Sequence, residues 1–288
     1  MDATEKDAVG VTWSEIQRRR LVELDAEPSE LEAQFESAAA RDRSFQQIES
    51  GLVKRERSRL RQVQQSQRGN ALASLEYRLA EALRADGFVQ VTTPIIMSRG
   101  LVAKMGIDDR HPLGEQIFWL GKNQCLRPML APHLYYLLVD LLRVWEKPVR
   151  LFEVGPCFRK ESQGAQHSNE FTMLNLVEMG LPQETRSARL KQLAGLVTAA
   201  AGLSDYHIET ETSEVYGETL DVVSSDRSLE LASGAMGPHF LDRAWKITDT
   251  WVGIGFGLER LLMAVRGSTN LKKTGRSLTY LNGIRLNV

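Results

Sequence analysis

The chain lacks several features that would place it at once in a large class of proteins. It has only two cysteines, Cys125 and Cys157, among 288 residues, too few for a disulfide framework or a cysteine-based metal cluster. This usage favours a reducing compartment, although the sequence leaves a disulfide between the two thiols open. The formal net charge of −1 means that any nucleic-acid partner must be bound by a local basic patch.

Long apolar runs are missing as well. The most apolar stretch, LYYLLVDLL, contains Asp140 and is too short to cross a bilayer. The first ten residues, MDATEKDAVG, are acidic and contain no apolar segment of the kind found in a secretory signal. We therefore expect a cytoplasmic protein without a membrane partner.

The sequence also lacks the glycine spacing of a dinucleotide-binding loop. The glycines of WVGIGFG, at positions 253, 255 and 257, do not follow the spacing G-x-G-x-x-G. No internal repeat is evident either, which argues against a repeat architecture.

Residues 1–69 show a helical pattern that ends in a cluster of positive charge. Capping boxes are expected for Thr12 with Glu15 and for Ser29 with Glu32, each ahead of apolar residues at helical spacing. The stretch KRERSRLRQVQQSQRGN then carries six basic residues and one acid, and its polar end resembles a linker; the basic residues are Lys54, Arg55, Arg57, Arg59, Arg61 and Arg68. Two interpretations stay open: a solvated helix face or a surface that contacts phosphates.

From residue 70 onward the pattern predicts an α+β domain that runs to residue 288. Asn70 is a candidate cap for a helix that Gly87 ends, and FVQVTTP then alternates like a strand up to Pro94. Further strands are expected at residues 116–120, 149–154, 171–179, 218–223, 228–232 and 251–255, and helices at 130–144, 187–201 and 258–265. Hairpin-like neighbours among these strands favour a mostly antiparallel sheet flanked by helices.

The polar loop between the strands that contain GPCF and EFTMLNL is longer than a structural hairpin needs. Hairpin loops usually have two to five residues, and longer ones often hold a ligand. Arg159 and Glu161 stand at the entrance of this loop.

Three separate elements together resemble the three motifs of class II aminoacyl-tRNA synthetases. They are the helix and strand of residues 71–94, the hairpin with FRKE, and the strand WVGIGFG followed by LER. Six phrases narrow the resemblance to pyrrolysyl-tRNA synthetases, in a short form without the separate N-terminal tRNA-binding domain: LRPMLAPHLYYLL, FEVGPCFRKES, EFTMLNL, VYGETLDV, GFGLERLL and YLNGIRLN.

This resemblance implies ATP-dependent ligation of pyrrolysine, a long neutral Nε-acylated lysine, to its cognate tRNA through an aminoacyl-adenylate. It implies a homodimer formed through the first motif, with ATP as substrate and Mg²⁺ as the metal. Arg159 and Arg260 are then the catalytic residues, and the ATP site comprises Arg159, Glu161, His167, Phe171, Glu230, Ser233 and Arg260. Glu230 and Ser233 would hold the Mg²⁺ ion.

The same resemblance implies an amino-acid pocket with almost no polar groups and no acid. Its residues are Ala131, Leu134, Tyr135, Leu138, Asn175, Val177, Tyr216, Ala235, Trp251 and Gly253. A lysine ammonium would lack a partner there, whereas Asn175 could hydrogen-bond an amide oxygen. The candidate tRNA contacts are Lys54, Arg55, Arg57, Arg59 and Arg61.

Two other functions stay open from the sequence. The chain could be a ligase of the same kind for another amino acid or another acceptor. It could also be a catalytically silent paralogue that binds RNA, although such a protein would be expected to lose motif residues such as Arg159 or Arg260, which are present here.

Overall fold

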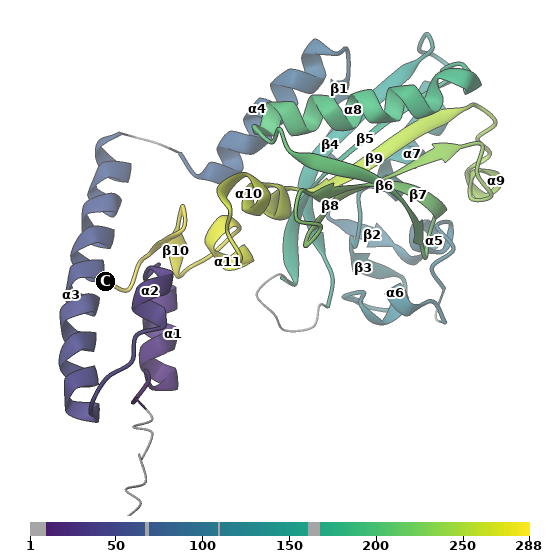
Figure 1. Ribbon diagram of the computed structural model, residues 1–288. Helices are drawn as coiled ribbons and strands as arrows, with labels where there is room; N and C mark the ends of the chain where they lie inside the picture. Colours follow the sequence, from purple (N-terminus) through teal and green to yellow (C-terminus); the bar gives the residue numbers. More distant parts are fainter. Residues whose placement is uncertain (1–9, 67–68, 109, 161–167) are drawn as a thin grey trace, which may run out of the picture. The chain divides into compact units, whose positions relative to one another are not determined.

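The computed structural model describes residues 10–66, 69–108, 110–160 and 168–288, and it divides into two compact units. The helical unit comprises Met1–Gly69 together with Ser277–Val288, and the catalytic-domain unit comprises Asn70–Arg276. Each is described by itself below (Figure 1).

The helical unit contains three helices and a small C-terminal hairpin among its described residues. The helices are α1 (Glu15–Glu23), α2 (Pro28–Leu31) and α3 (Ala38–Gln65), and the hairpin pairs β10 (Tyr280–Leu281) with β11 (Ile284–Arg285). Trp13, Leu21, Leu24 and Leu52 form its small core, against which Val288 also packs. The C-terminal end of the chain thus completes a core begun by the N-terminal helices.

Both predicted capping boxes are displaced from their expected positions. The box at α1 joins Ser14 and Gln17 instead of Thr12 and Glu15, and the one at α2 joins Glu27 and Glu30. Thr12 and Ser29 are each two residues away from the observed N-cap residues, Ser14 and Glu27. Several neighbouring polar residues fit the capping-box pattern, so the sequence alone does not fix the first residue of the helix.

A seven-stranded sheet with the order β1-β4-β5-β9-β8-β7-β6 forms the centre of the catalytic-domain unit. All neighbouring strands are antiparallel except β1 and β4, which are parallel, so the predicted α+β class with a mostly antiparallel sheet is confirmed. The strands are β1 (Val89–Gln90), β4 (Val149–Phe158), β5 (Glu170–Met179), β6 (Tyr206–Ser213), β7 (Gly217–Ser224), β8 (Glu230–Gly237) and β9 (Trp251–Gly257).

Helices cover one face of this sheet and form the larger of two cores. They are α4 (Ala71–Ala85), α8 (Arg186–Ala201), α10 (Leu258–Arg266) and α11 (Leu271–Thr274). Asn70 caps α4 as predicted, because its side chain accepts hydrogen bonds from the amides of Leu72 and Ala73. From β9, the side chains of Val252, Ile254 and Phe256 point into this core.

The opposite face carries the second core and the candidate site. It is covered by α7 (Ala131–Leu141) and by the hairpin of β2 (Ile96–Ser98) and β3 (Gln124–Leu126), together with the short helices α5 (Arg99–Ala103), α6 (Pro112–Glu115) and α9 (Asp242–Trp245). The short helix η1 (Gln183–Thr185) leads directly into α8. Because side chains alternate along a strand, Val177 of β5 and Trp251 of β9 belong to this second core.

One expectation for this unit needs correction, and one question that the sequence left open is answered. Residues 116–120 do not form a strand: they follow α6, and Trp119 makes only an isolated bridge to Cys125. Cys125 and Cys157 are both free and buried, so the disulfide that the sequence left open does not form. Burial in apolar surroundings raises the pKa of the Cys157 thiol to about 12, which makes it an inert core group.

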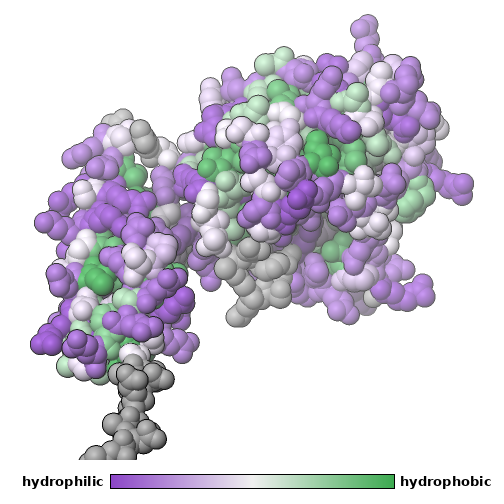
Figure 2. Space-filling view, viewed as in Figure 1, coloured by the Kyte–Doolittle hydropathy of each residue, from purple (hydrophilic) through white to green (hydrophobic). Residues whose placement is uncertain are grey.

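No helix among the described residues is both long and apolar enough to span a membrane. In Figure 2 the visible face of the helical unit is mainly hydrophilic, with hydrophobic residues in separate patches. That pattern is typical of a surface that meets water or a polar partner.

Candidate active site

The floor of the candidate site is made by three adjacent strands whose residues align in rows. One row joins Asn175 of β5, Gly255 of β9 and Ser233 of β8, and the next joins Val177, Gly253 and Ala235. A Cβ atom on Gly255 would lie 2.8 Å from Asn175 Oδ1, so any other residue there would push into the Asn175 amide. The glycines at alternate positions of WVGIGFG therefore leave the space above this part of β9 free of side chains.

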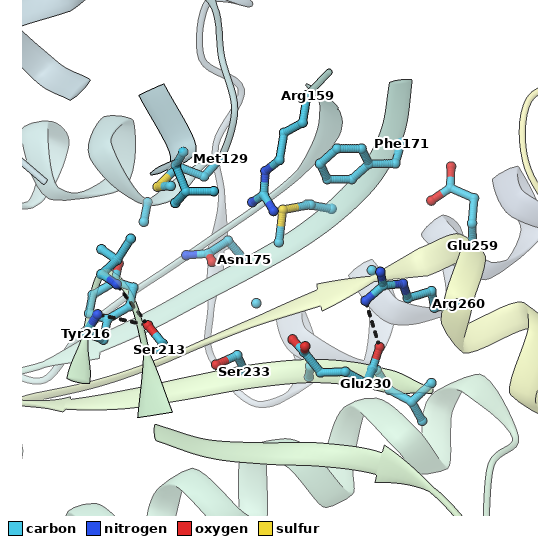
Figure 3. A pocket seen from close by; sticks show the side chains of 18 of the residues that line it. Met129, Arg159, Phe171, Asn175, Ser213, Tyr216, Glu230, Ser233, Glu259 and Arg260 are labelled. Atoms are coloured by element: carbon cyan, nitrogen blue, oxygen red, sulfur yellow. Dashed lines mark hydrogen bonds between the residues drawn. The ribbon is translucent and has the colours of Figure 1, made fainter. Parts of the chain in front are cut away.

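Above this floor lies a cavity of about 440 Å³. Its lining includes five of the residues expected in the ATP site, namely Arg159, Phe171, Glu230, Ser233 and Arg260. Figure 3 shows Arg260 and Glu230 at one end of the cavity, Tyr216 at the other and Asn175 between them. Glu161 and His167 lie outside the described residues.

The two arginines are held by backbone carbonyls, which fixes their direction. Arg159 Nε donates to the carbonyl of Pro128 at 3.0 Å, and its guanidinium lies 5.3 Å from the centre of the Phe171 ring. Arg260 Nη1 donates to the carbonyl of Glu230 at 3.3 Å (Figure 3). Two fixed guanidinium groups beside an aromatic ring can hold an anionic group next to a flat ring system.

Arg159 depends in turn on a buried polar network. Arg127 donates to Glu153 Oε1 at 2.7 Å and to the carbonyl of Pro156 at 2.7 Å, and Glu153 accepts from Thr93. Arg127 precedes Pro128, whose carbonyl holds Arg159, and both Arg127 and Glu153 are almost completely buried. The ion pair thereby anchors the segment that orients Arg159.

Glu259 ties α10 to β5 beside Phe171. Its carboxylate accepts the Thr172 amide at 2.8 Å and the Thr172 hydroxyl at 2.9 Å. Burial raises its pKa, while the Thr172 hydrogen bonds oppose that shift. The sequence placed Glu259 in the third motif without giving it a role, because the pairing with Thr172 spans 87 residues.

Glu230 and Ser233 supply the oxygen atoms that a hard cation would require. Ser233 donates its hydroxyl hydrogen to Asp221 Oδ1 at 2.7 Å, which leaves the lone pairs of the Ser233 oxygen available. Burial and the nearby Asp221 carboxylate raise the pKa of Glu230, whereas Arg260 and Arg159 lower it. Negative charge that gathers in this way favours a bound cation.

These donors fit Mg²⁺ better than a metal held by many protein ligands. Among the described residues, no group of three or more His, Cys, Asp and Glu side chains could hold a metal ion. Mg²⁺ commonly has one or two protein oxygen ligands and completes its shell with water and phosphate oxygens. Asp221, which the sequence gave no role, orients the Ser233 hydroxyl.

The residues expected around the amino acid divide into two sets. Ala131, Asn175 and Tyr216 line the cavity itself. Six more are buried in the second core, next to the cavity: Leu134, Tyr135, Leu138, Val177, Ala235 and Trp251. Burial raises the pKa of both Tyr135 and Tyr216.

Several lining residues were not anticipated from the sequence. They are Leu113, Met129, Ser168, Met173, Ser213, Glu214, Val215, Leu231, Ala232, Gly255, Gly257 and Leu271. Ser213 Oγ accepts the amides of Val215 and Tyr216 and so shapes the turn between β6 and β7 that carries Tyr216. No periodic pattern marked this turn, since its role depends on the position of the hairpin over the sheet.

The site thus combines an arginine-lined, aromatic end with an apolar end, on the face of an antiparallel sheet. Residues 57–282 match the family model of tRNA synthetases class II core domain (F). The chain belongs to the class II tRNA synthetase core-domain family.

Solved structures extend this similarity over nearly the whole chain. A pyrrolysyl-tRNA synthetase from Desulfitobacterium hafniense is 53% identical, with a TM-score of 0.90, and the match covers 96% of this chain and 99% of that one. A second pyrrolysyl-tRNA synthetase structure from the same organism is 51% identical, also with a TM-score of 0.90, and covers 100% of both chains.

Curated class II enzymes match over shorter regions. The histidine–tRNA ligase of Methanocaldococcus jannaschii is 28% identical over 137 residues, and the lysine–tRNA ligase of Oceanobacillus iheyensis is 26% identical over 148 residues. These matches cover 46% and 48% of this chain. The chain spans 33% and 27% of the length of these two relatives.

The helical unit places the predicted tRNA-contacting residues in two groups along α3. Arg55 Nη2 donates to the carbonyls of Leu24 and Asp25 at the end of α1, and Arg59 Nη1 contacts the buried Glu56 carboxylate at 2.9 Å. Lys54, Arg57 and Arg61 are exposed, and within the described part of the chain none of them has an ion-pair partner. These three residues share one side of the helix, which we call the basic stripe.

Proposed function

We propose that this protein ligates pyrrolysine, or a closely similar neutral Nε-acylated lysine, to its cognate tRNA. The observation that carries the proposal is the apolar inner end of the site, where Asn175 is the polar side chain beside a wall of Tyr135, Tyr216 and Trp251. The 53% identity to a pyrrolysyl-tRNA synthetase over 96% of the chain supports it.

The first chemical step joins the amino-acid carboxylate to the α-phosphorus of ATP and releases pyrophosphate. The carboxylate is already a nucleophile, so the site needs to neutralise phosphate charge and to align the reactants. Arg159 would bind the α-phosphate, and Arg260 would bind the far end of the triphosphate. Phe171 would stack on the adenine ring, and Glu161 would accept a hydrogen bond from its amino group.

Glu230 and Ser233 would hold Mg²⁺, with the Asp221 carboxylate fixing the Ser233 hydroxyl. The ion would supply positive charge against the phosphate oxygens of ATP. Arg159 and Arg260 act on the same charge from the protein side, and their carbonyl contacts keep them in place before ATP arrives.

The amino-acid side chain would extend from this charged region toward the aromatic wall. The Asn175 side chain would donate a hydrogen bond to the amide oxygen of an acylated lysine. Glu214 also lines the cavity, but it is exposed to solvent and so offers little to a buried ammonium. A free lysine would lose the hydration of its charge at the inner end without a partner.

In the second step the acyl group passes from the adenylate to a 3′-terminal hydroxyl of the tRNA, which breaks the acyl–phosphate bond and releases AMP and a proton. We assign the sequence-independent part of tRNA binding to the basic stripe of α3, formed by Lys54, Arg57 and Arg61, since exposed cations bind phosphates and set the salt dependence of affinity. Arg55 and Arg59 lie on the adjoining side, where their intramolecular partners are.

A homodimer through residues 71–94 and their neighbours completes the proposal. Val89, Ile95 and Ile96 expose between 43% and 50% of their surface in this part of the chain. Apolar residues that cluster in this way are commonly covered by a partner. Sedimentation velocity should give twice the mass of the 32.4 kDa chain, and a monomer at micromolar concentration would contradict the dimer.

The deciding experiment is ATP–pyrophosphate exchange with pyrrolysine, with Nε-acylated lysines and with the twenty common amino acids. Exchange should depend on pyrrolysine or a bulky Nε-acylated lysine and should not exceed background with free lysine. Exchange with lysine or with another common amino acid would reject the proposed substrate. Exchange with none of them would support the silent paralogue.

A further inference from the structure

A buried carboxylate lies behind the aromatic end of the site. Asp242 is the first residue of α9 and is 5% exposed. Its two oxygens accept the Trp251 indole Nε1–H at 2.9 and 3.0 Å, and one of them accepts the His239 amide at 2.6 Å. A carboxylate buried in this way needs such donors, and the indole in turn is fixed by the carboxylate.

The Trp251 indole is tightly packed on the side that faces the Asp242 carboxylate. Gly237 is paired with Trp251 across β8 and β9, and a Cβ atom on Gly237 would lie 1.8 Å from Nε1. The far edge of the ring is directed to the floor, because Cζ3 lies 3.5 Å from the position of a Cβ atom on Gly253. One edge of the indole is thus held by Asp242 while the opposite edge shapes the pocket.

Trp251 also sets the positions of the two tyrosines. Its ring centre lies 5.6 Å from that of Tyr135 at an interplanar angle of 77°, and 6.4 Å from that of Tyr216 at 66°. Edge contacts of this kind depend on ring orientation. A rotation of the indole would therefore disturb both neighbours.

His239, in the turn that precedes Asp242, contacts the backbone of Tyr216. The Leu241 amide donates to His239 Nδ1 at 3.3 Å, so Nδ1 is the unprotonated nitrogen and Nε2 carries the hydrogen. His239 Nε2 then donates to the Tyr216 carbonyl at 2.7 Å. The turn of residues 237–242 therefore holds Trp251 from one side and the backbone of Tyr216 from another.

We propose that Asp242 is a positioning residue that determines the shape of the inner end of the amino-acid pocket by holding the Trp251 indole. It acts through Trp251, without contact with the substrate. The inference rests on the proposed function for the identity of the substrate, and its structural part can be tested without any substrate.

The kinetic test compares Asp242→Asn and Asp242→Ala with Asp249→Asn as a matched control. Asp249 lies in the same stretch of chain, and its carboxylate contacts Lys147, which is 45% exposed. In ATP–pyrophosphate exchange, Asp242→Ala should raise the KM for the Nε-acylated lysine about tenfold, equal to about 1.4 kcal/mol. The kcat and the KM for ATP should stay within about twofold.

Asp242→Asn should give a smaller increase, since one amide oxygen can still accept the indole hydrogen. Asp249→Asn should leave both KM values unchanged. Equal increases in the KM for ATP and for the amino acid would indicate a general loss of structure and would overturn the positioning role. An unchanged KM for the amino acid in both Asp242 variants would overturn it as well.

Fluorine NMR of protein labelled with 5-fluorotryptophan gives a readout that needs no substrate. The chain has five tryptophans, and Trp251→Phe assigns the resonance of Trp251 by its loss. Asp242→Asn should shift that resonance and leave those of Trp13, Trp119 and Trp145 in place, whereas Trp245 lies on α9 itself and can shift as well. If the Trp251 resonance does not move, the proposed contact is wrong, whatever the kinetics show.

The two proposals fail in different ways. If the wild-type protein activates no Nε-acylated lysine while the Trp251 resonance responds to Asp242→Asn, the proposed substrate is wrong and the indole contact stands. If exchange proceeds as expected and Asp242→Ala changes neither the KM nor the spectrum, only the positioning role is rejected.

Discussion

Both units of the protein contain clustered basic side chains, but the surroundings of these side chains differ. In the helical unit, Lys54, Arg57 and Arg61 of the basic stripe extend into solvent. In the catalytic-domain unit, Arg159 and Arg260 are bound to backbone carbonyls at the edge of a cavity, and Arg127 is buried next to Pro128, whose carbonyl holds Arg159. A flexible exposed cation contributes affinity, whereas a fixed cation in a partly dry site can stabilise a transition state.

The same contrast applies to carboxylates. Glu56 is buried in the helical unit and is contacted by Arg55 and Arg59, whose side chains are about 40% exposed. Glu153 is buried in the catalytic-domain unit together with a buried partner, Arg127. Loss of a cation should therefore have very different consequences in the two places.

The largest effect is expected from Arg127→Met. The change leaves Glu153 as an uncompensated buried charge and should lower the free energy of unfolding by about 3–5 kcal/mol. The matched change Arg59→Met should cost only about 0–1 kcal/mol, because Arg59 is partly exposed and Glu56 keeps Arg55. Calorimetry would compare the melting temperatures, and equal shifts would contradict the distinction between the two units.

The next effect concerns catalysis. Arg159→Ala or Arg260→Ala should slow amino-acid-dependent ATP–pyrophosphate exchange about 100-fold or more, the scale for loss of one preorganised donor. Neither side chain belongs to a hydrophobic core, so the melting temperature should stay close to that of the wild type. Near-normal exchange in Arg159→Ala would contradict its place in the ATP site.

A smaller effect is expected from pH on the affinity for Mg²⁺. The pKa of Glu230 is raised, chiefly by burial and then by Asp221, so its carboxyl keeps a proton to a higher pH than an ordinary glutamic acid. Cation binding needs the deprotonated form, so Mg²⁺ affinity should fall as pH decreases through this raised pKa, approaching about tenfold per pH unit.

Exchange rates measured against Mg²⁺ concentration between pH 5 and 8, together with Mn²⁺ binding followed by electron paramagnetic resonance, would check this. Glu230→Gln should weaken binding and remove the pH dependence. If the wild type kept the same Mg²⁺ affinity down to pH 5, Glu230 would not be a ligand.

The smallest effect on chemistry is expected from the basic stripe. Reversal of Arg57 and Arg61 to Glu should raise the KM for tRNA and flatten its salt dependence, because phosphate contacts govern both. ATP–pyrophosphate exchange, which needs no tRNA, should be unchanged. Loss of both reactions would make the segment structural, and no change in either would make the stripe a solvated face.

Several parts of the fold and the site follow from local sequence. Asn70 and the leucines after it specify α4, and the alternating residues of WVGIGFG specify a strand with a bare side. Motif residues such as Arg159, Phe171 and Arg260 could be predicted as one site because their order along the chain resembles known motifs. The strand expected at residues 116–120 was wrong, since this short run pairs with Cys125 of β3 only through an isolated bridge at Trp119 and forms no longer ladder.

Contacts between distant segments could not be predicted in the same way. Whether Thr172 meets Glu259, or whether Ser277–Val288 joins the N-terminal helices, depends on how the elements pack and not on local propensity. Arg55 illustrates the same limit, because only the position of α1 supplies the carbonyls of Leu24 and Asp25 to which this member of the charged run donates.

The sequence by itself determined which residues we propose for the chemistry: the arginines, the acids and the glycines that leave room for them. Tertiary structure alone decided how they are supported, through Arg127 beneath Arg159 and Asp242 behind Trp251. The physical reason is that periodicity and motif spacing are local properties of the chain, whereas the burial of a charge and its compensation are set by residues brought together from separate elements.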